Sequence, residues 1–297
     1  MYESLKKHSD NFHLYIFAFD SRSFNLLKKL NLEFVTVISL DDLEDEELLK
    51  VKKDRTASEY CWTCTPSTIK YCLDTFYLKS CTYLDADLYF FSNPKILIEE
   101  MSKKSVLITE HRYTKEYDQS ATSGIYCVQF MTFKNDNNGM RVLNWWRNAC
   151  NTWCYARFED GKFGDQKYLD DWKDRFEGIH VLQHLGGGVA PWNIQQYNLE
   201  EKLFELVFYH FHHFRFLSNH TVDLGNYRLR KIDLEMLYNP YLKHLEKIKN
   251  EISKVDSSYD YHGSVNIKIE WKMPLRYLKR KFKRTYNVYD MHYILGL

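Results

Sequence analysis

Thr82-Tyr83-Leu84-Asp85-Ala86-Asp87-Leu88-Tyr89-Phe90-Phe91 is a β-prone run that carries two carboxylates, and the turn signal Ser92-Asn93-Pro94 closes it. In an extended segment alternate side chains point the same way, so Asp85 and Asp87 share a face where the strand gives way to a loop. Two hard oxygen ligands placed there suit a divalent cation that also holds phosphate oxygens. The run therefore predicts a nucleotide-sugar site; the plain alternative is that both carboxylates only solvate a strand end.

Segments of strand and helix character alternate around this run. The sequence predicts strands at 13–20, 34–38, 105–109, 123–130 and 179–182, and helices at 24–30, in the acidic segment 41–47, at 66–77 and around 140–150. This order predicts an α/β fold with a mostly parallel sheet flanked by helices. Ligands of such sheets gather at the carboxyl ends of the strands, where Asp20, Asp85 and Asp87 fall.

The composition limits the classes of partner. With 297 residues, of which 44% are hydrophobic, the chain can build one large α/β domain with an appendage, or two smaller domains. A net charge of +1 gives no overall field that favours nucleic acid, and the sequence carries no motif that reads it, so we expect no nucleic-acid partner.

The seven cysteines are odd in number and scattered, which predicts a reducing, cytoplasmic location rather than a disulfide framework. No secretory signal or membrane-spanning stretch is found in the sequence. Cys61-x-x-Cys64 and the pair Cys150 and Cys154 lack the glycines of a zinc knuckle, so we interpret them as core residues.

Four later motifs carry polar or glycine residues in chemically informative patterns. Asp165-Gln166 precedes Lys-Tyr-Leu, a good helix start in which Asp165 is the N-cap. Gly186-Gly187-Gly188 permits a mobile loop or a close approach of backbone to ligand. Ser123-Gly124 permits a similar approach or a tight strand entry. The run 209–213 contains His210, His212 and His213, of which the first two share a face if the run is extended.

In this order, the motifs 83–87, 123–125, 164–169, 191–193 and 208–212 resemble those of the GT-A (Rossmann-like) glycosyltransferases, in particular the bacterial retaining enzymes related to glycogenin and the lipooligosaccharide galactosyltransferases. The resemblance covers about residues 12 to 220, and its specificity lies in the order of the five motifs. It implies a hexosyltransferase-like enzyme that moves a sugar from a nucleotide-diphosphate donor, with UDP favoured, to a hydroxyl of a glycan or glycolipid. It further implies retention of configuration and a role in bacterial surface polysaccharide synthesis.

The resemblance also implies site residues. The metal ligands would be Asp85, Asp87 and His210, with His212 and His213 as rivals for the histidine position, and Mn²⁺ is favoured over Mg²⁺. This chain has His212-His213 where the relatives have a small residue and glycine. The resemblance therefore does not imply a phosphate contact by this loop. The catalytic residues would be Asp165 and Gln166. Donor or acceptor contacts would come from Phe19, Asp20, Arg55, Asp85, Ala86, Ser123, Gly124, Gly187, Trp192 and Asn193.

The last third of the chain differs in composition from the rest. We expect a catalytic domain at 1–225 and a helical, basic extension at 226–297. Its segment 271–284 interleaves basic and apolar residues. Such a segment either lies on an anionic membrane surface, which would put the enzyme on the inner face of the plasma membrane beside a lipid-linked acceptor, or is a solvated basic face.

Two other function classes stay open. A nucleotidyltransferase that forms the activated sugar also uses paired aspartates and a metal, but a Gly-rich basic loop should follow its first strand, and residues 19–24 have none. A non-catalytic sugar-binding or protein-binding module would keep the fold and lose the metal.

Overall fold

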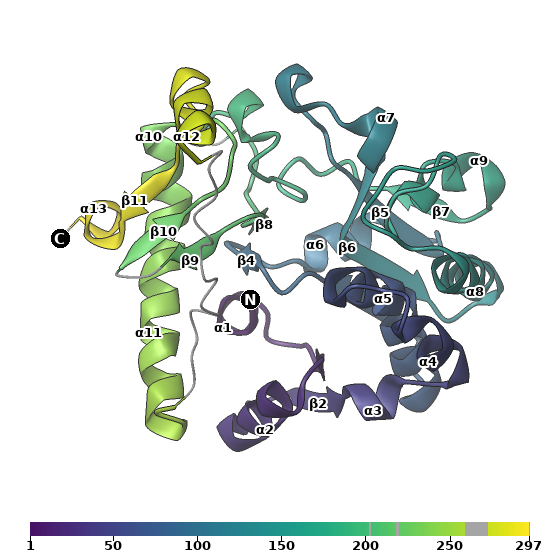
Figure 1. Ribbon diagram of the computed structural model, residues 1–297. Coiled ribbons are helices and arrows are strands. Elements are labelled where there is room, and N and C mark those ends of the chain that lie inside the picture. The colour runs from purple at the N-terminus through teal and green to yellow at the C-terminus, as the bar shows by residue number, and fades with distance from the viewer. Residues whose placement is uncertain (202, 218–219, 259–272, 297) are drawn as a thin grey trace.

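The computed structural model describes residues 1–201, 203–217, 220–258 and 273–296. It is a mixed α/β structure, which confirms the predicted fold class. Figure 1 shows a four-stranded sheet with its helices on the right, a long helix with a small sheet on the left, and the strands β4 and β8 between them. No helix within the described ranges combines the length and hydropathy of a membrane-spanning segment.

The N-terminal elements follow the prediction closely. Strand β1 pairs in parallel with β2, and the Asp20 side chain caps α2 by accepting from the Ser23 amide at 2.8 Å. The acidic segment forms two short helices, and a capping box of Thr56 and Glu59 starts α5. The elements are α1 (Tyr2–His8), β1 (Leu14–Ala18), α2 (Ser21–Leu30), β2 (Val35–Ser39), α3 (Leu40–Leu43), α4 (Glu46–Lys52) and α5 (Ala57–Thr75).

Helix α5 begins nine residues before the predicted start at Pro66, which lies inside it. The reason for the error is burial. Residues 59–60 and 63–69 are all buried although they include Glu59, Thr63 and Thr65, so no regular apolar stripe marks this part of the helix in the sequence.

The central sheet has the strand order β3-β6-β5-β7. Strands β5 and β7 pair in parallel, whereas β6 is antiparallel to both β3 and β5. Three of the four strands therefore point the same way and β6 is reversed, which corrects the prediction of mostly parallel pairing. The link from β5 to β6 contains no long crossover helix, and a parallel pair would need one. The strands are β3 (Ser80–Leu84), β5 (Val106–Glu110), β6 (Tyr126–Lys134) and β7 (Ile179–Val181).

Two cores cover the faces of this sheet. On one face α5 and α8 (Asn137–Thr152) pack through Ile69, Leu73 and Trp146, whose ring stacks on Phe133 at 6.2 Å. On the other face Phe130 stacks on Phe208 at 5.3 Å in a core shared with α1 and α6 (Lys95–Glu100). The register between β5 and β6 shifts between Leu107 and Thr109, which is the mark of a β-bulge.

The run 82–91 is two strands rather than one. Strand β3 ends at Leu84, a tight turn holds Asp85, Ala86 and Asp87, and β4 (Leu88–Phe90) follows. Strand β4 then leaves the central sheet and pairs antiparallel with β8 (Phe208–His210), with Leu88 opposite His210. The prediction of an extended segment through both aspartates was therefore wrong, because the chain turns between the two sheets at this point.

Residues on both sides of the predicted 225/226 boundary form one small sheet and one core. Strand β10 pairs with β9 before the boundary and with β11 after it, and α11 packs Tyr241 against Phe211 at 3.7 Å. The division into two domains stays a prediction. The elements are β9 (Arg215–Leu217), β10 (Thr221–Asp223), α10 (Lys231–Asp233), the π-helix η4 (Leu234–Tyr238), α11 (Asn239–Val255), α12 (Met273–Phe282), β11 (Val288–Asp290) and α13 (Met291–Leu295).

Short elements complete the chain between the sheets. Most of them lie in the segments that lead to and from β6 and β7. They are η1 (Lys115–Tyr117), α7 (Ser120–Ser123), η2 (Lys167–Leu169), α9 (Trp172–Arg175) and η3 (Ile194–Gln196).

The glycine run 186–188 is packed against protein on all sides. A Cβ atom on Gly186 would lie 1.8 Å from the Glu205 carbonyl oxygen, and one on Gly187 would lie 2.6 Å from Leu182 Cδ2. Gly188 has φ +93 and a Cβ there would meet Thr109 at 2.7 Å. The glycines therefore allow the backbone to approach neighbouring segments, and the alternative of a mobile loop was wrong.

We expect Gly186→Ala to lower the free energy of unfolding by about 3 kcal/mol or more, because the new methyl group meets backbone that has no room to move. The matched control is Gly161→Ala, where no atom lies within 4 Å and only φ +74 is unfavourable, for about 1 kcal/mol. Urea unfolding of both variants measures the difference. Equal, small losses would contradict the packed arrangement.

Candidate functional site

The turn between β3 and β4 presents Asp85 and Asp87 from a fixed backbone. The Asp85 amide donates to the Gln129 carbonyl at 3.0 Å, and the Leu88 amide closes the turn on the Asp85 carbonyl at 3.3 Å. The Tyr83 hydroxyl donates to Asp85 Oδ1 at 2.9 Å. Ala86, between the two, is exposed. Both carboxylates are therefore held at the surface end of the central sheet.

His210 joins these carboxylates from β8. Its Nε2 lies 3.1 Å from Asp87 Oδ1 and 3.7 Å from Asp85 Oδ2, and the three ligand atoms all lie within 4.8 Å of one another. His210 is buried, whereas both carboxylates are partly open. Two carboxylate oxygens and one imidazole nitrogen form a donor set that fits a divalent ion such as Mn²⁺.

The other two histidines lie outside this group of ligand atoms. Strand β8 ends at His210, so the extended run that would have put His212 on the same face does not form. His212 and His213 instead stack on each other at 3.9 Å, and His213 has φ 66. Burial lowers the pKa of His212 to about 3, which leaves its ring neutral.

The charges of this cluster compensate one another. Burial is the largest single influence on His210 and opposes its charge, but Asp87, Cys127 and Asp85 together outweigh burial and raise the pKa of His210 well above its usual value. Burial and the charge of Asp87 raise the pKa of Asp85. Burial also opposes ionisation of Asp87, but its interactions with His210 and His212 together lower its pKa. Without a metal ion, the imidazolium is the cation that neutralises the carboxylates; a bound divalent ion would replace its Nε2 proton.

The charge of Asp85 also acts on Asp165, which lies on a different segment of the chain. Asp165 is 5% exposed, and its carbonyl accepts from Trp146 Nε1 at 2.9 Å. Burial, followed by the charge of Asp85, raises the pKa of Asp165 to about 7. The predicted N-cap is wrong, because the short 3-10 helix begins at Lys167 and has no side-chain cap. The side chain is therefore free of a capping role.

Two motifs that are distant in the sequence meet beside Asp165. Gln166 Nε2 donates to the Ser123 carbonyl at 2.7 Å. Gly124 has φ +109, and a Cβ there would lie 3.1 Å from Asp170 Oδ1, which accepts from the Ile125 amide at 2.7 Å. The amide of Gln166 thus holds the Ser123-Gly124 turn in place.

Trp192 borders the histidines. Its ring centroid lies 5.3 Å from those of both His210 and His212, and its Nε1 donates to the His111 carbonyl at 2.8 Å. Asn193 is fully buried; its amide donates to His111 and Gly188 carbonyls, both at 2.8 Å, and accepts from the Ala190 amide at 2.9 Å. Asn193 therefore ties the glycine run, which includes Gly187, to the loop at 111.

The N-terminal candidates have other neighbours. Phe19 packs with Leu43 and Tyr60 in a separate small core, and Asp20 caps α2. The Arg55 guanidinium lies 3.8 Å above the Tyr155 ring, and its buried Nε has no hydrogen-bond partner. These three side chains interact with their own surroundings rather than with the carboxylate pair.

Two further residues of this site were not predicted from the sequence. Gln129, in β6, accepts from His210 Nδ1 through its Oε1 at 2.7 Å. Thr65, in α5, lies beside the Asp165 side chain and opposes the rise in its pKa. Gln129 was detectable as a polar residue within an apolar strand, but the sequence contains no signal that it faces His210.

No family model matches the sequence. The chain is 32% identical over 271 residues to the uncharacterised protein YfnD of Bacillus subtilis (strain 168), and the alignment covers 85% of this chain and 85% of YfnD. The chain belongs to the YfnD family. It is also 28% identical over 280 residues to the uncharacterised YfnF of the same organism, covering 89% of this chain and 92% of YfnF.

Solved structures similar to this YfnD-family chain are glycosyltransferases. Mouse xyloside xylosyltransferase 1 matches with a TM-score of 0.43 and 14% identity, over 70% of this chain and 89% of that one. A glycosyltransferase involved in glycosylation of the major capsid of PBCV-1 matches with a TM-score of 0.38 and 11% identity, over 67% and 94%. At these TM-scores the likeness carries no conclusion about activity, which has to come from the site itself.

The pKa of Asp165 predicts how the stability of this YfnD-family chain depends on pH. The folded value of about 7 exceeds the ordinary 3.8, so between these values the folded protein keeps a proton that the unfolded chain has lost. Asp165 therefore reduces stability progressively as the pH rises from about 4 to 7. Asp165→Asn removes this loss, and we expect it to be more stable than the parent by a few kcal/mol above pH 7, roughly 1.4 kcal/mol per pKa unit.

Thermal and urea unfolding in EDTA at pH 4.5, 6 and 8 measure this difference. The control is Asp74→Asn, an exposed aspartate of α5 that pairs with Lys70. A stability difference for Asp165→Asn that does not grow with pH would contradict a protonated, buried carboxyl.

Proposed function

We propose that this protein is a metal-dependent glycosyltransferase that moves a sugar from a nucleotide diphosphate to an acceptor hydroxyl. The observation that carries the proposal is the convergence of Asp85, Asp87 and His210 at the end of the central sheet of an α/β fold. Ligands of such sheets bind outside the carboxyl ends of the strands, where these side chains meet.

Asp85, Asp87 and His210 would hold the ion, with Mn²⁺ favoured over Mg²⁺ because an imidazole nitrogen joins two oxygen ligands. When bound, the ion would act as a Lewis acid that neutralises the charge developing on the diphosphate leaving group. The protein keeps two ligands partly open, which leaves room for phosphate oxygens to complete the coordination. UDP as the nucleotide and retention of configuration come from the family resemblance alone.

Asp165 suits a contact with sugar hydroxyls. A carboxyl whose pKa is about 7 exchanges between a hydrogen-bond donor and an acceptor near neutral pH, and it can hold a proton at that position. Gln166 would act through the Ser123-Gly124 turn that it supports, where the glycine leaves the backbone open to a close approach. Trp192 and Gly187 would border the acceptor side.

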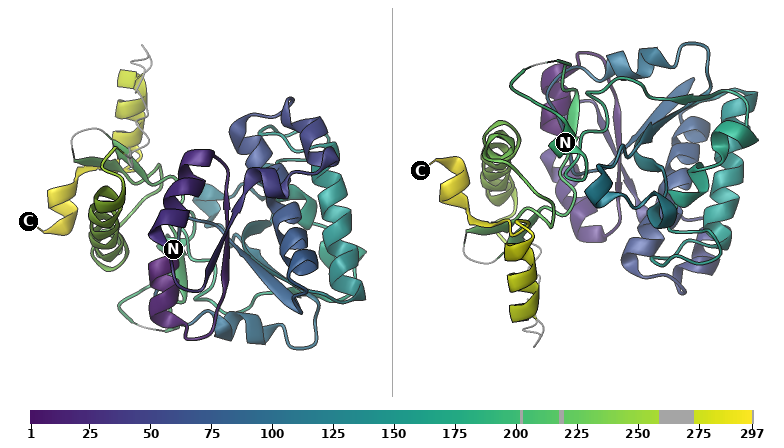
Figure 2. Two further views of the ribbon diagram at one scale, coloured as in Figure 1. Left: turned by 90° about the horizontal axis from the view of Figure 1, so that it is seen from below. Right: turned by 90° about the horizontal axis from the view of Figure 1, so that it is seen from above.

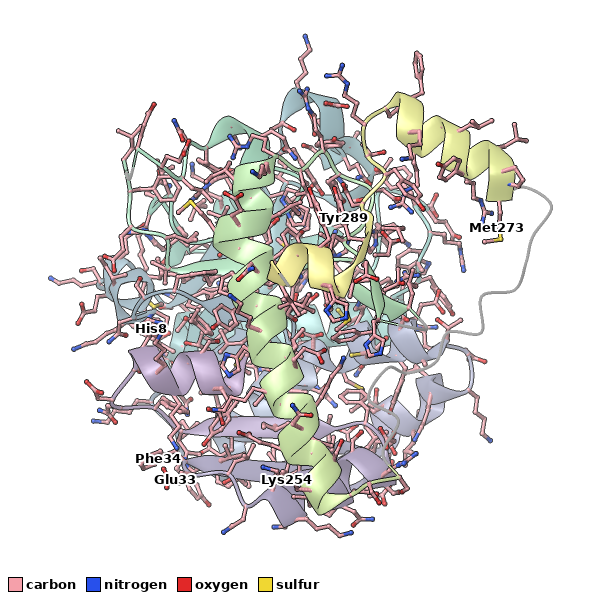
Figure 3. The ribbon with its side chains drawn as sticks, turned by 90° about the vertical axis from the view of Figure 1, so that its left-hand side faces the viewer. His8, Glu33, Phe34, Lys254, Met273 and Tyr289 are labelled. Carbon is pink, nitrogen blue, oxygen red and sulfur yellow. The ribbon has the colours of Figure 1, made fainter. Side chains whose placement is uncertain are left out.

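The acceptor is proposed to be a glycan or a lipid-linked glycan of a bacterial surface polysaccharide, reached from the cytoplasmic face of the membrane. Helix α12 supports this location. Its apolar side chains Leu275, Leu278 and Phe282 are 62%, 62% and 92% exposed, with Lys279 and Lys281 between them. Figures 2 and 3 show α12, from Met273 onward, projecting from the rest of the molecule. Basic and apolar side chains on one projecting helix fit an anionic membrane surface.

The first test measures release of nucleoside diphosphate from a panel of UDP-sugars and GDP-sugars, with Mn²⁺ and with EDTA. We expect turnover of one donor, dependent on metal, and a loss of at least 100-fold in Asp87→Asn because one metal ligand is lost. The exposed-site control Asp74→Asn should retain the parent rate. Formation of a sugar nucleotide from a nucleoside triphosphate and a sugar phosphate, with release of pyrophosphate, would favour the nucleotidyltransferase. No donor binding or turnover, with no effect of metal, would favour the binding module.

A second test addresses the membrane. We expect the protein to float with vesicles that contain phosphatidylglycerol and not with vesicles of phosphatidylcholine alone, and Leu278→Glu to lose this binding because it puts a carboxylate on the inserted face. The control Leu203→Glu changes another exposed leucine, 77% exposed, and should bind as the parent does. Equal binding to neutral vesicles, or binding to duplex DNA instead, would contradict the membrane role.

A further inference from the structure

Gln129 contacts the metal-ligand cluster twice, once through its backbone and once through its side chain. Its carbonyl accepts from the Asp85 amide at 3.0 Å, and its Oε1 lies 2.7 Å from His210 Nδ1. Asp85 lies in the turn that follows β3 and His210 ends β8 in another sheet, so one residue of β6 contacts two ligands from separate parts of the fold.

The side-chain contact decides which nitrogen of His210 carries a proton. A carboxamide oxygen only accepts, so Nδ1 facing Oε1 has to donate. With the proton of neutral imidazole committed to Nδ1, the lone pair of Nε2 points at Asp85 and Asp87, where an ion would lie. Cys127 also interacts with the ring, but without the Gln129 acceptor the tautomer with a proton on Nδ1 is favoured less, and the other tautomer, in which Nε2 carries the proton, cannot bind a metal.

We propose that Gln129 is a positioning residue that fixes the tautomer and the ring orientation of His210 for metal binding. The inference rests on the proposed function, since it assumes that Asp85, Asp87 and His210 hold the ion. In this role Gln129 acts through its contact with His210.

The local geometry of β6 turns Gln129 toward His210. Cys127, like Gln129, faces His210, whereas Val128 packs in the core on the other face of the sheet. The register of the β5–β6 pair shifts in this part of the strands, which marks a β-bulge. Bulges commonly turn side chains toward functional sites.

Gln129 is fully buried, and its Nε2 has no hydrogen-bond partner. A buried donor of this kind destabilises the fold, and an apolar side chain of the same length would avoid the penalty. The carboxamide therefore contributes something other than stability.

The test measures Mn²⁺ affinity of the full chain without donor, from the electron paramagnetic resonance signal of free Mn²⁺. We expect Gln129→Met, which keeps the volume and removes the acceptor, to weaken binding 10- to 100-fold. Gln129→Glu keeps an acceptor and should stay within a few-fold of the parent. The control Thr132→Val, on the same strand as Gln129, removes a partly buried 2.9 Å hydrogen bond to Thr82 of β3 and should not alter affinity.

A spectroscopic readout separates positioning from general destabilisation. In protein labelled with ¹⁵N-histidine and bound to diamagnetic Mg²⁺, we expect His210 Nδ1 to be protonated in the parent and in Gln129→Glu, and the two tautomers to mix in Gln129→Met. If Gln129→Met does not fold, Gln129→Asn replaces it, since the shorter side chain withdraws the acceptor from Nδ1.

Unchanged Mn²⁺ affinity and an unchanged tautomer in Gln129→Met would overturn the inference while leaving the metal centre intact, as would an equal loss in Gln129→Glu and Gln129→Met. A parent protein that binds no Mn²⁺ would overturn the metal centre and this inference together. The two failures are therefore distinguishable.

Discussion

The pairing of β4 with β8 is the interaction on which the site depends. It sets Leu88 opposite His210, and the Phe211 amide donates to the Asp87 carbonyl at 3.0 Å, so the aspartate turn and the histidine are held by one short ladder. Because the side-chain period of a strand is two residues, a slip by one residue would turn His210 to the opposite face. The stacking of Phe208 on Phe130 supports this register, so the hydrophobic core on that side of the sheet helps to position the candidate metal ligands.

The cluster shows how a protein keeps charge at a buried position. Two carboxylates close together would repel, and burial of each is unfavourable, yet Asp87 keeps a lowered pKa because the His210 imidazolium lies 3.1 Å away. Within the described part of the chain no cation offsets the burial of Asp165, and its pKa rises to about 7 instead. Burial therefore leaves Asp87 ionised, because a cation lies beside it, and raises the pKa of Asp165, where burial and the charge of Asp85 act together.

Local patterns predicted the strands up to β7, the longer helices and the residue types of the candidate ligands, because those signals lie within a few residues. The predicted trio of Asp85, Asp87 and His210 does converge, and burial of Asp165 agrees with its being more than a surface cap. The reversed strand β6, the turn at Asp85 and the contact of Gln129 with His210 could not be predicted, because each depends on which distant segments pair and in what register. Asn193 and Gly187 of the glycine run were predicted to contact the donor or the acceptor. In the fold, Asn193 donates to the Gly188 carbonyl and the glycines pack closely against neighbouring segments. The sequence alone does not separate packing from binding.

The base of α12 and the loop that follows His210 are joined by contacts between folded segments. Arg280, near the end of α12, binds both oxygens of Asp223 and the Gly225 carbonyl, and a Cβ on Gly225 would lie 3.1 Å from His213. Asn287 donates to the same Gly225 carbonyl at 3.1 Å. The backbone around Gly225 therefore lies between the base of α12 and the loop that follows His210. If the projecting end of α12 binds a surface, these contacts hold the site in a fixed orientation to that surface. The fold then sets the distance from the surface to the proposed acceptor position.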